Sequence, residues 1–218
     1  MAATLKIDFV SDVTCPWCAV GLHALLKALE QVQPDIEAQL HFQPFELNPR
    51  MEPGGEDAIE HLARKYGSTP AQLAQVRNTI RQRGAEVGFE FHPNGRARIY
   101  NTRAAHRLLY WAGAEHPDKQ MALKLALLKD CHRDQQAMEE PAVLRRAAEE
   151  AGLDGEAAAE VLASGRYDDE VSEAEAMYQS AGIHAVPAVV INDRHLISGG
   201  QPVEVFEAAL RQIAAQPA

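Results

Sequence analysis

Cysteine is scarce in this sequence, and long hydrophobic runs are absent from it. The 218 residues include three cysteines, which are too few and odd in number for a disulfide scaffold. No apolar stretch approaches the roughly 18 residues that span a bilayer. The opening residues also lack the basic segment and apolar segment of a secretory signal. We therefore expect a cytoplasmic protein that neither relies on disulfide staples nor enters a membrane.

Positive charge is also in short supply. Lysine and arginine number 21 against 31 aspartate and glutamate residues, which gives a formal net charge of −10 at pH 7. A nucleic-acid backbone would be repelled on average, so we expect no nucleic-acid partner. With 46% apolar and 24% charged residues, the chain has the composition of a globular protein long enough to bury its own core.

The beginning of the chain is patterned as a β-α-β unit. Residues 5–10 alternate apolar and polar side chains, which predicts a strand. Apolar residues recur at helical spacing over residues 20–29, and residues 38–45 alternate again. The first strand, a helix and a second strand are therefore complete by about residue 46.

A long helical block and a β-β-α unit follow. We expect five to seven helices between about residues 57 and 180, interrupted by a Pro-Asn-Gly turn that leaves room for a brief extended segment within residues 89–95. Residues 186–191 and 195–198 predict two strands, and residues 202–215 predict a closing amphipathic helix. The β signal therefore returns only at the end of the chain.

Neither flanking unit has enough strands to form a stable sheet alone. We therefore predict an α/β protein in which residues 1–47 and 183–218 build one discontinuous domain. Residues 48–182 would form an all-helical domain inserted between its β-α-β and β-β-α halves.

Two of the cysteines form the motif Cys15-Pro16-Trp17-Cys18 (CPWC), placed where the first strand ends and a helix begins. A thiol attacks as its thiolate, and the unpaired N–H groups of a helix N-terminus favour that form. Pro16 suits the first helical position because it has no N–H to lose. We expect Cys15 to be an exposed nucleophile and Cys18, one turn further on, to face the protein as the resolving thiol.

Two other interpretations of this cysteine pair are a zinc site and a pair of buried structural thiols. Zinc needs two further ligands, and the adjacent Cys131 and His132 would diverge by about 100° on a helix. Core cysteines, for their part, do not cluster at strand-turn-helix junctions. We expect no metal and no bound cofactor, and we treat Cys131 as a lone helical cysteine.

The CPWC motif, together with Val186-Pro187 ahead of a short apolar strand, resembles the DsbA-like branch of the thioredoxin superfamily. Residues 11–14 before the motif, 44–49 after the second strand and 101–108 at a helix start are similar to the FrnE-type subgroup. That subgroup is related to the 2-hydroxychromene-2-carboxylate isomerases and the kappa-class glutathione transferases. The resemblance spans nearly the whole chain and implies a thioredoxin fold with a large helical insertion.

The resemblance also implies a redox-active disulfide that works by mixed-disulfide exchange. Cys15 would attack, Cys18 would resolve, and Pro187 would face them as a cis-proline. The backbone of Val186 would pair with the substrate chain as an added strand.

Three further residues are substrate-contact candidates. Pro16 and Trp17 lie within the motif, and His106 could approach the dithiol, although a structural hydrogen bond of a helix histidine is the alternative. The strongly oxidising DsbA has a histidine where this sequence has Trp17, and an indole cannot carry positive charge. We therefore predict a pKa of Cys15 that is less depressed than in DsbA, and a lower reduction potential.

Two enzyme classes fit these features. The first is a thiol-disulfide oxidoreductase acting on disulfides of proteins or small thiols, with glutathione as a candidate co-substrate. The second is a glutathione-dependent isomerase or transferase, whose members typically have serine at the position of Cys15. Retention of both Cys15 and Cys18 favours the redox class, and a non-enzymatic binding module is a third alternative. We expect a monomer or a homodimer.

Overall fold

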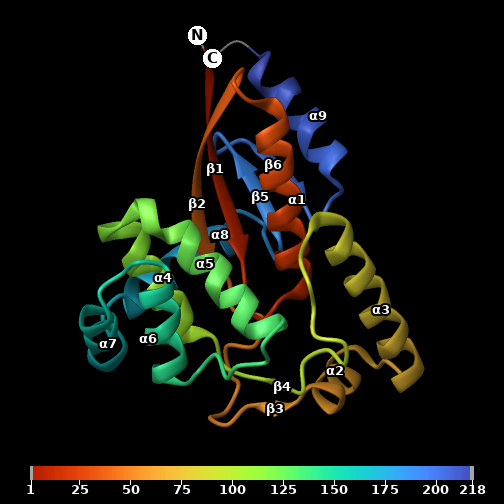
Figure 1. Cartoon of the computed structure of the whole chain (residues 1–218), viewed down its shortest axis with the longest axis vertical. Coiled ribbons are helices and arrows are strands. Elements are labelled where there is room, and N and C mark those ends of the chain that lie inside the picture. Colours follow the sequence, from red (N-terminus) through yellow and green to blue (C-terminus); the bar gives the residue numbers. More distant parts are fainter. Residues whose placement is uncertain (1, 217–218) are drawn as a thin grey trace.

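The predicted order of a β-α-β unit, a run of helices and a β-β-α unit is confirmed, and two short strands that were not predicted lie within the run of helices (Figure 1). The computed structural model describes residues 2–216. The elements are β1 (Ala3–Ser11), α1 (Pro16–Val32), β2 (Ile36–Pro44), β3 (Glu56–Asp57), α2 (Ala58–Tyr66), α3 (Pro70–Val87), β4 (Arg98–Ile99), α4 (Arg103–Glu115), α5 (Pro117–His132), α6 (Pro141–Glu150), α7 (Gly155–Ser164), α8 (Asp168–Ser180), β5 (Ala188–Ile191), β6 (His195–Ser198) and α9 (Val203–Ala214). Over these residues, no helix combines the length and the apolar character needed to cross a membrane.

One four-stranded sheet joins the two ends of the chain. Its strand order is β2-β1-β5-β6, with β1 parallel to β2 and antiparallel to β5. Phe9 in the central strand pairs with Phe42 on one side and with Val189 on the other. Because β1 has neighbours on both sides, the β-α-β and β-β-α halves share a sheet that neither could build alone.

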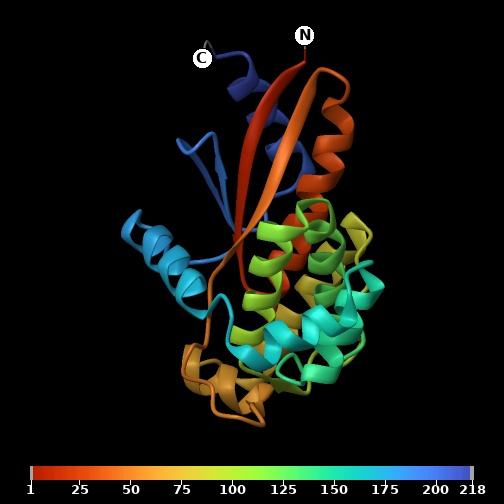
Figure 2. The ribbon, with the colours of Figure 1, turned by 90° about the vertical axis from the view of Figure 1, so that its left-hand side faces the viewer.

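Helices cover both faces of this sheet. Ile7 and Phe9 pack against α1 and α9 in the larger core, whereas Val10 packs on the opposite face against Tyr178 of α8. Figure 2 shows α1 and α8 on opposite sides of the strands. Helix α8, which the sequence places in the insertion, therefore also shields the sheet from water.

Helices α4 to α7 form most of a second core, which Val13 of the turn before α1 joins. Leu108, Trp111, Leu127 and Leu144 are almost fully buried at its centre. The described part of the segment between β2 and β5 has seven helices, α2 to α8, which agrees with the predicted number. The thioredoxin-like α/β fold with a large helical insertion is thus confirmed.

The insertion is not entirely helical, and the predicted extended segment was misplaced. The short strand is β4, whose Ile99 pairs with Glu56 of β3, and no strand occurs within residues 89–95. The rings of Phe89 and Phe91 lie 4.7 Å apart in an edge-on contact and turn into the larger core. Aromatic burial, rather than a strand ladder, therefore decides the conformation of this stretch.

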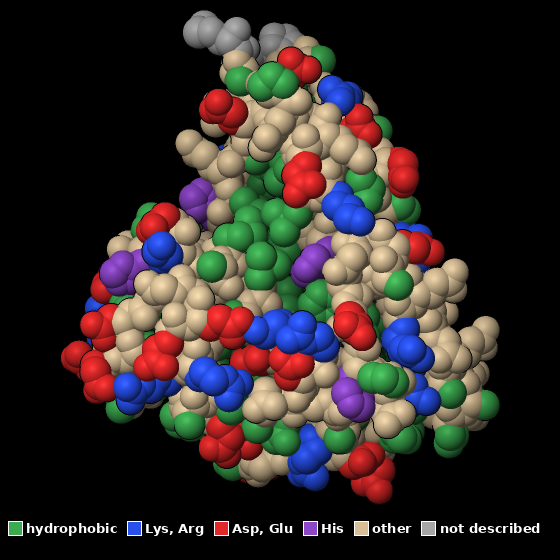
Figure 3. Space-filling model, viewed as in Figure 1, with side chains coloured by type: hydrophobic (Ala, Val, Ile, Leu, Met, Phe, Trp, Pro, Cys, Tyr) green, Lys and Arg blue, Asp and Glu red, His purple; other side chains and the backbone are tan. Residues whose placement is uncertain are grey.

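Hydrophobic side chains gather in a furrow on the face that Figure 3 shows, between β2 and α1. Acidic and basic side chains are interspersed around this furrow rather than separated into fields of one sign. No large basic surface is visible on this face.

Candidate active site

The CPWC motif lies at the N-terminus of α1, as predicted. Cys15 is the N-cap residue and Pro16 the first helical residue. The preceding turn is closed by the N–H of Cys15, which donates to the carbonyl of Asp12 at 3.1 Å. The Sγ atom of Cys15 is in turn 3.6 Å from the carbonyl oxygen of Val186, its hydrogen-bond acceptor. The fold therefore brings together two segments that are 171 residues apart in the sequence.

The peptide bond between Val186 and Pro187 is cis, as the resemblance implied. It precedes β5, so Pro187 is held by the sheet next to the start of α1. The structure therefore places Cys15, Cys18, Val186 and Pro187 together, and their roles in catalysis stay a prediction.

The two thiols of the motif differ in acidity. The pKa of Cys15 lies below its ordinary value. The main cause is the hydrogen bond from the Cys18 side chain, which stabilises the Cys15 thiolate more than burial destabilises it. The backbone N–H groups of Cys18 and Trp17 stabilise the thiolate further. Burial instead raises the pKa of Cys18 well above its ordinary value. Cys15 is therefore the thiol that ionises first, which is the order needed for an attacking and a resolving cysteine.

The expectation that Cys15 is openly exposed was wrong. Its exposed fraction is 5%, and that of Cys18 is 0%. Cys15 lies in the wall of a cleft of about 770 Å³, together with Pro16, Trp17 and Val186. The inserted helices and the chain after β2 enclose the start of α1, so a substrate must enter this cleft to meet the sulfur.

The cleft combines apolar walls with a few polar groups. Leu73, Val76 and Ile80 of α3 form an apolar side. Lys65 and Arg96 bring positive charge to the same space. The guanidinium of Arg96 donates to the hydroxyl of Thr14, the residue before Cys15. The cleft is therefore suited to a ligand with apolar and negatively charged parts.

His106, proposed as a substrate contact, does not line this cleft. It is 2% exposed, and its Nε2 atom lies 3.5 Å from Oδ1 of Asp12. Its ring therefore lies against Asp12 of the turn that carries Cys15, and its buried Nε2 atom has no hydrogen-bond partner among residues 2–216, so the structural hydrogen bond offered as the alternative is not formed at this atom.

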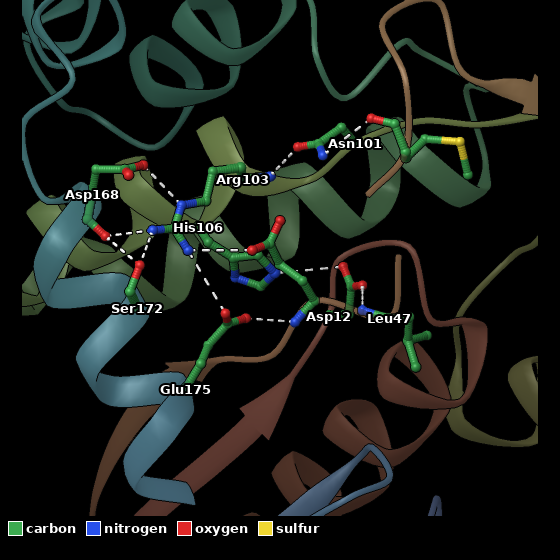
Figure 4. Close-up of polar contacts among 10 residues, drawn as sticks. Asp12, Leu47, Asn101, Arg103, His106, Asp168, Ser172 and Glu175 are labelled. Carbon is green, nitrogen blue, oxygen red and sulfur yellow. Dashed lines mark hydrogen bonds and ion pairs between the residues drawn. The ribbon is translucent and has the colours of Figure 1, made fainter. Parts of the chain in front are cut away.

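Asp12 was not singled out as a site residue from the sequence, although it stands three residues before Cys15. Its side chain is fully buried. Oδ2 accepts the N–H of Leu47 at 2.8 Å, and Oδ1 accepts the N–H of Thr14 at 3.0 Å. Figure 4 shows this carboxylate between Leu47 and His106. Its position next to the motif was visible in the sequence, but its partners lie on distant segments.

Lys124 of α5 is a second missed residue. It is 1% exposed, and its Nζ atom lies 5.8 Å from the centre of the Phe42 ring. Burial lowers the pKa of Lys124, whereas the charges of Cys18 and Asp12 act in the opposite direction. The sequence gives no sign that Lys124 is buried, because most lysines in helices lie on the surface.

Cys131 is expected to remain unreactive while Cys15 reacts. It is 5% exposed, and burial raises the pKa of Cys131 to about 11, so its thiolate is rare at pH 7. Brief iodoacetamide treatment at pH 7, followed by peptide mass spectrometry, should modify Cys15 and leave Cys131 free. The same treatment in urea is the control. Rapid labelling of Cys131 in the folded protein, or loss of activity in Cys131→Ser, would contradict this assignment.

Within residues 2–216, no three histidine, cysteine, aspartate or glutamate side chains are grouped so that they could hold a metal ion. Cys131 and His132 are adjacent on α5. His132 contacts the ring of Phe91, with the ring centres 5.5 Å apart.

The fold and the cysteine pair define a thioredoxin-like protein with a helical insertion. The sequence matches the profile of the family described as DSBA-like thioredoxin domain over residues 6–211. The match covers nearly the whole chain, and the protein therefore belongs to this family of thiol oxidoreductases.

Individual relatives agree with this membership. The Bacillus subtilis protein YwbO is 27% identical over 208 residues, which cover 95% of this chain and 96% of YwbO. The crystal structure of a probable DsbA oxidoreductase from Streptomyces coelicolor superposes with a TM-score of 0.87 at 29% identity. That superposition covers 98% of this chain and 92% of the other.

Two more distant structures share the fold. A 2-hydroxychromene-2-carboxylate isomerase superposes with a TM-score of 0.68 at 16% identity, over 95% of both chains. The cytosolic disulfide reductase DsbM from Pseudomonas aeruginosa, solved with glutathione, gives 0.65 at 18% identity, over 97% of this chain and 100% of DsbM. At these identities the likeness concerns the fold.

Proposed function

We propose that this protein is a thiol-disulfide oxidoreductase of the FrnE-type subgroup, acting by mixed-disulfide exchange through Cys15 and Cys18. One observation carries the proposal. The thiol with the lowered pKa lies at a helix N-terminus, in the wall of a large cleft, and beside the carbonyl of Val186. The Cys15 sulfur is thus a nucleophile that a substrate can reach through the cleft, and it lies beside a backbone segment that can pair with the substrate chain.

The exchange has two steps. The Cys15 thiolate attacks one sulfur of the substrate disulfide, forms a mixed disulfide and releases the other sulfur as a thiolate. Cys18 then loses its proton and attacks Cys15, which forms the Cys15–Cys18 disulfide and releases the remaining substrate thiolate. The substrate gains two electrons, and the protein loses two. Because the pKa of Cys18 is raised, this second step requires its proton to be removed as the attack occurs.

The cleft favours a small disulfide or an extended chain over a folded protein surface. Its volume of about 770 Å³ is within the range of small-molecule pockets. Lys65 and Arg96 lie in its lining, where they can attract carboxylates such as those of glutathione. The glutathione in the DsbM structure is consistent with this choice of co-substrate. A cytoplasmic location, where glutathione is the main small thiol, belongs to the same proposal.

Replacing Cys18 with serine is expected to trap the mixed disulfide on Cys15. Without the resolving thiol, the adduct cannot be released by internal attack. Incubation with oxidised glutathione, followed by intact-mass spectrometry without reductant, should show one added glutathione per chain. Cys15→Ser is the matched control and should show none, and Cys131→Ser should behave as the unsubstituted protein. Absence of any adduct on the Cys18→Ser variant would refute the exchange mechanism.

A glutathione-dependent isomerase is the second candidate. The enclosed, partly apolar cleft and the fold of 2-hydroxychromene-2-carboxylate isomerase favour it. In such an enzyme the thiol of glutathione performs the chemistry, so turnover should survive in Cys18→Ser. In the oxidoreductase, disulfide reduction by the same variant in the absence of free reduced glutathione should stop once the mixed disulfide has formed, and this comparison separates the two candidates.

A further inference from the structure

A buried carboxylate and the reactive thiol share one short turn. Asp12 and Cys15 stand at its two ends, and the hydrogen bond from the Cys15 N–H to the Asp12 carbonyl measures 3.1 Å. The exposed fractions of the two residues are 0% and 5%. The Asp12 carboxylate itself accepts the N–H of Thr14, the residue before Cys15, at 3.0 Å. Negative charges near each other and away from water raise each other's free energy. An ionised Asp12 therefore disfavours the thiolate of Cys15.

The contacts of Asp12 keep its carboxylate ionised. Burial opposes the charge, but the contact with His106 and the backbone N–H groups of Leu47 and Thr14 outweigh it, so the pKa of Asp12 lies below its ordinary value. Figure 4 shows Leu47 and His106 reaching the carboxylate from two different segments. Both oxygens are used, since Oδ1 faces Thr14 and His106 whereas Oδ2 faces Leu47.

The two lysines that respond to the charge of this carboxylate, Lys65 and Lys124, do not pair with it. Across residues 2–216, Asp12 forms no ion pair with a lysine or arginine, and its one ion-pair contact is His106 at 3.5 Å. Burial lowers the pKa of Lys65 of α2 and of Lys124 of α5, and the charge of Asp12, which acts on both lysines over a longer distance, opposes this effect. Burial lowers the pKa of His132 on α5 and so favours its uncharged form. The charge of Asp12 accordingly acts against the lowered pKa of Cys15.

We propose that Asp12 is a positioning residue that makes the Cys15–Cys18 pair more reducing and thereby directs the exchange toward reduction of substrates. The proposal rests on the proposed function. The reduced pair consists of a thiolate at Cys15 and a thiol at Cys18. With oxidised glutathione, two electrons leave the pair, the disulfide forms, and one glutathione thiolate and one glutathione thiol are released. Only the reduced protein contains the Cys15 thiolate. The negative charge of Asp12 raises the free energy of that thiolate, so it favours the disulfide form and lowers the reduction potential of the pair.

The test is the reduction potential of Asp12→Asn, with Asp12→Ser as a second neutral variant whose hydroxyl can accept one of the two N–H groups. In glutathione redox buffers, both should shift the equilibrium roughly tenfold toward the reduced protein, which corresponds to about 30 mV. Absorbance titration at 240 nm should show a lower pKa of Cys15. Circular dichroism establishes which of the two Asp12 variants folds, and one folded variant is enough for the comparison of potentials.

Asp8 offers a matched control on β1. Its carboxylate is 1% exposed and is bound by Gln43 at 2.8 Å and Lys6 at 3.1 Å, and it does not belong to the turn before α1. Asp8→Asn should therefore keep the potential of the unsubstituted protein.

Two results would overturn the role of Asp12. One is an equilibrium within twofold of the unsubstituted protein in the folded Asp12 variants, and the other is an equal shift in Asp8→Asn. Failure of the proposed function has a different signature. If the proposed function fails, Cys18→Ser traps no glutathione adduct. A lower pKa of Cys15 in the 240 nm titration of the Asp12 variants would still support the effect of the Asp12 charge on Cys15.

Discussion

Replacing Arg103 with methionine is expected to destabilise the protein by about 2–4 kcal/mol. Arg103 is 22% exposed, and its guanidinium lies 3.2 Å from Glu46, 2.8 Å from Asp168 and 3.7 Å from Glu175. Glu46 and Glu175 have exposed side-chain fractions of only 6% and 12%. Without Arg103, these two buried carboxylates lose the arginine that pairs with both of them, and no other lysine or arginine among residues 2–216 forms an ion pair with either. The exposure of Arg103 and of Asp168 reduces the expected loss below that of a fully buried cluster.

The loss should depend on pH in a defined direction. Burial and the neighbouring Glu46 raise the pKa of Glu175, and removal of Arg103 would raise it further. Arg103 lowers the pKa of Asp168, so the stability that this pair adds is present at neutral pH and lost as pH falls through the acid range. The stability difference between variant and unsubstituted protein should therefore shrink below about pH 4.5.

Urea unfolding at several pH values measures this difference. Arg145→Met is the matched control, because Arg145 is 42% exposed and pairs with Glu149 and Glu156, which are also exposed. It should cost less than about 1 kcal/mol. Equal losses in the two variants, or a loss in Arg103→Met that does not change with pH, would show that the buried carboxylates do not depend on Arg103. Figure 4 shows why they should, since Arg103 connects α4 with α8 next to the turn that carries Asp12.

Replacing Gly21 with valine is expected to cost about 3 kcal/mol or more and to reduce disulfide exchange at least about tenfold. Gly21 lies in α1, where a Cβ atom would be 3.1 Å from Cγ of Pro187 and 3.2 Å from Cα of Gly200. An alanine at this position requires small shifts, and we expect the two additional γ-carbons of valine to require larger ones. Pro187 would be pushed from its place beside the CPWC motif, and the approach of substrate to Cys15 would change.

A graded series tests this explanation. Gly21→Ala gains helix propensity of about 1 kcal/mol, which the tight contact opposes, so its stability should lie close to that of the unsubstituted protein. Glu30→Val, on the exposed side of α1, carries the β-branched penalty without the contact and should cost less than about 1 kcal/mol. Thermal unfolding and glutathione disulfide reduction should then rank Gly21→Val far below both. A fully active and stable Gly21→Val would refute the steric account.

The cysteine pair shows how much of the site could be predicted locally. Four contiguous residues place Cys15 at the start of a helix and Cys18 one turn later, because capping and helical spacing act over a single turn. The pairing with Val186 could be named only through a resemblance, since the two segments are 171 residues apart. The burial of Cys15 was missed because the covering elements, the inserted helices and the chain after β2, belong to other parts of the sequence.

The order of the main elements, the α/β class and the position of the dithiol could all be predicted from the residue pattern. These properties depend on hydrophobic periodicity and turn residues, which act between neighbours along the chain. Three features follow from chain packing and not from local pattern: Asp12 contacts Leu47 and His106, Lys124 is buried, and Arg103 pairs with carboxylates from two segments. The partners of charged and polar side chains cannot be identified from a repeating pattern in the sequence. The energies of these interactions depend on distance and burial, which are set by how the chain packs.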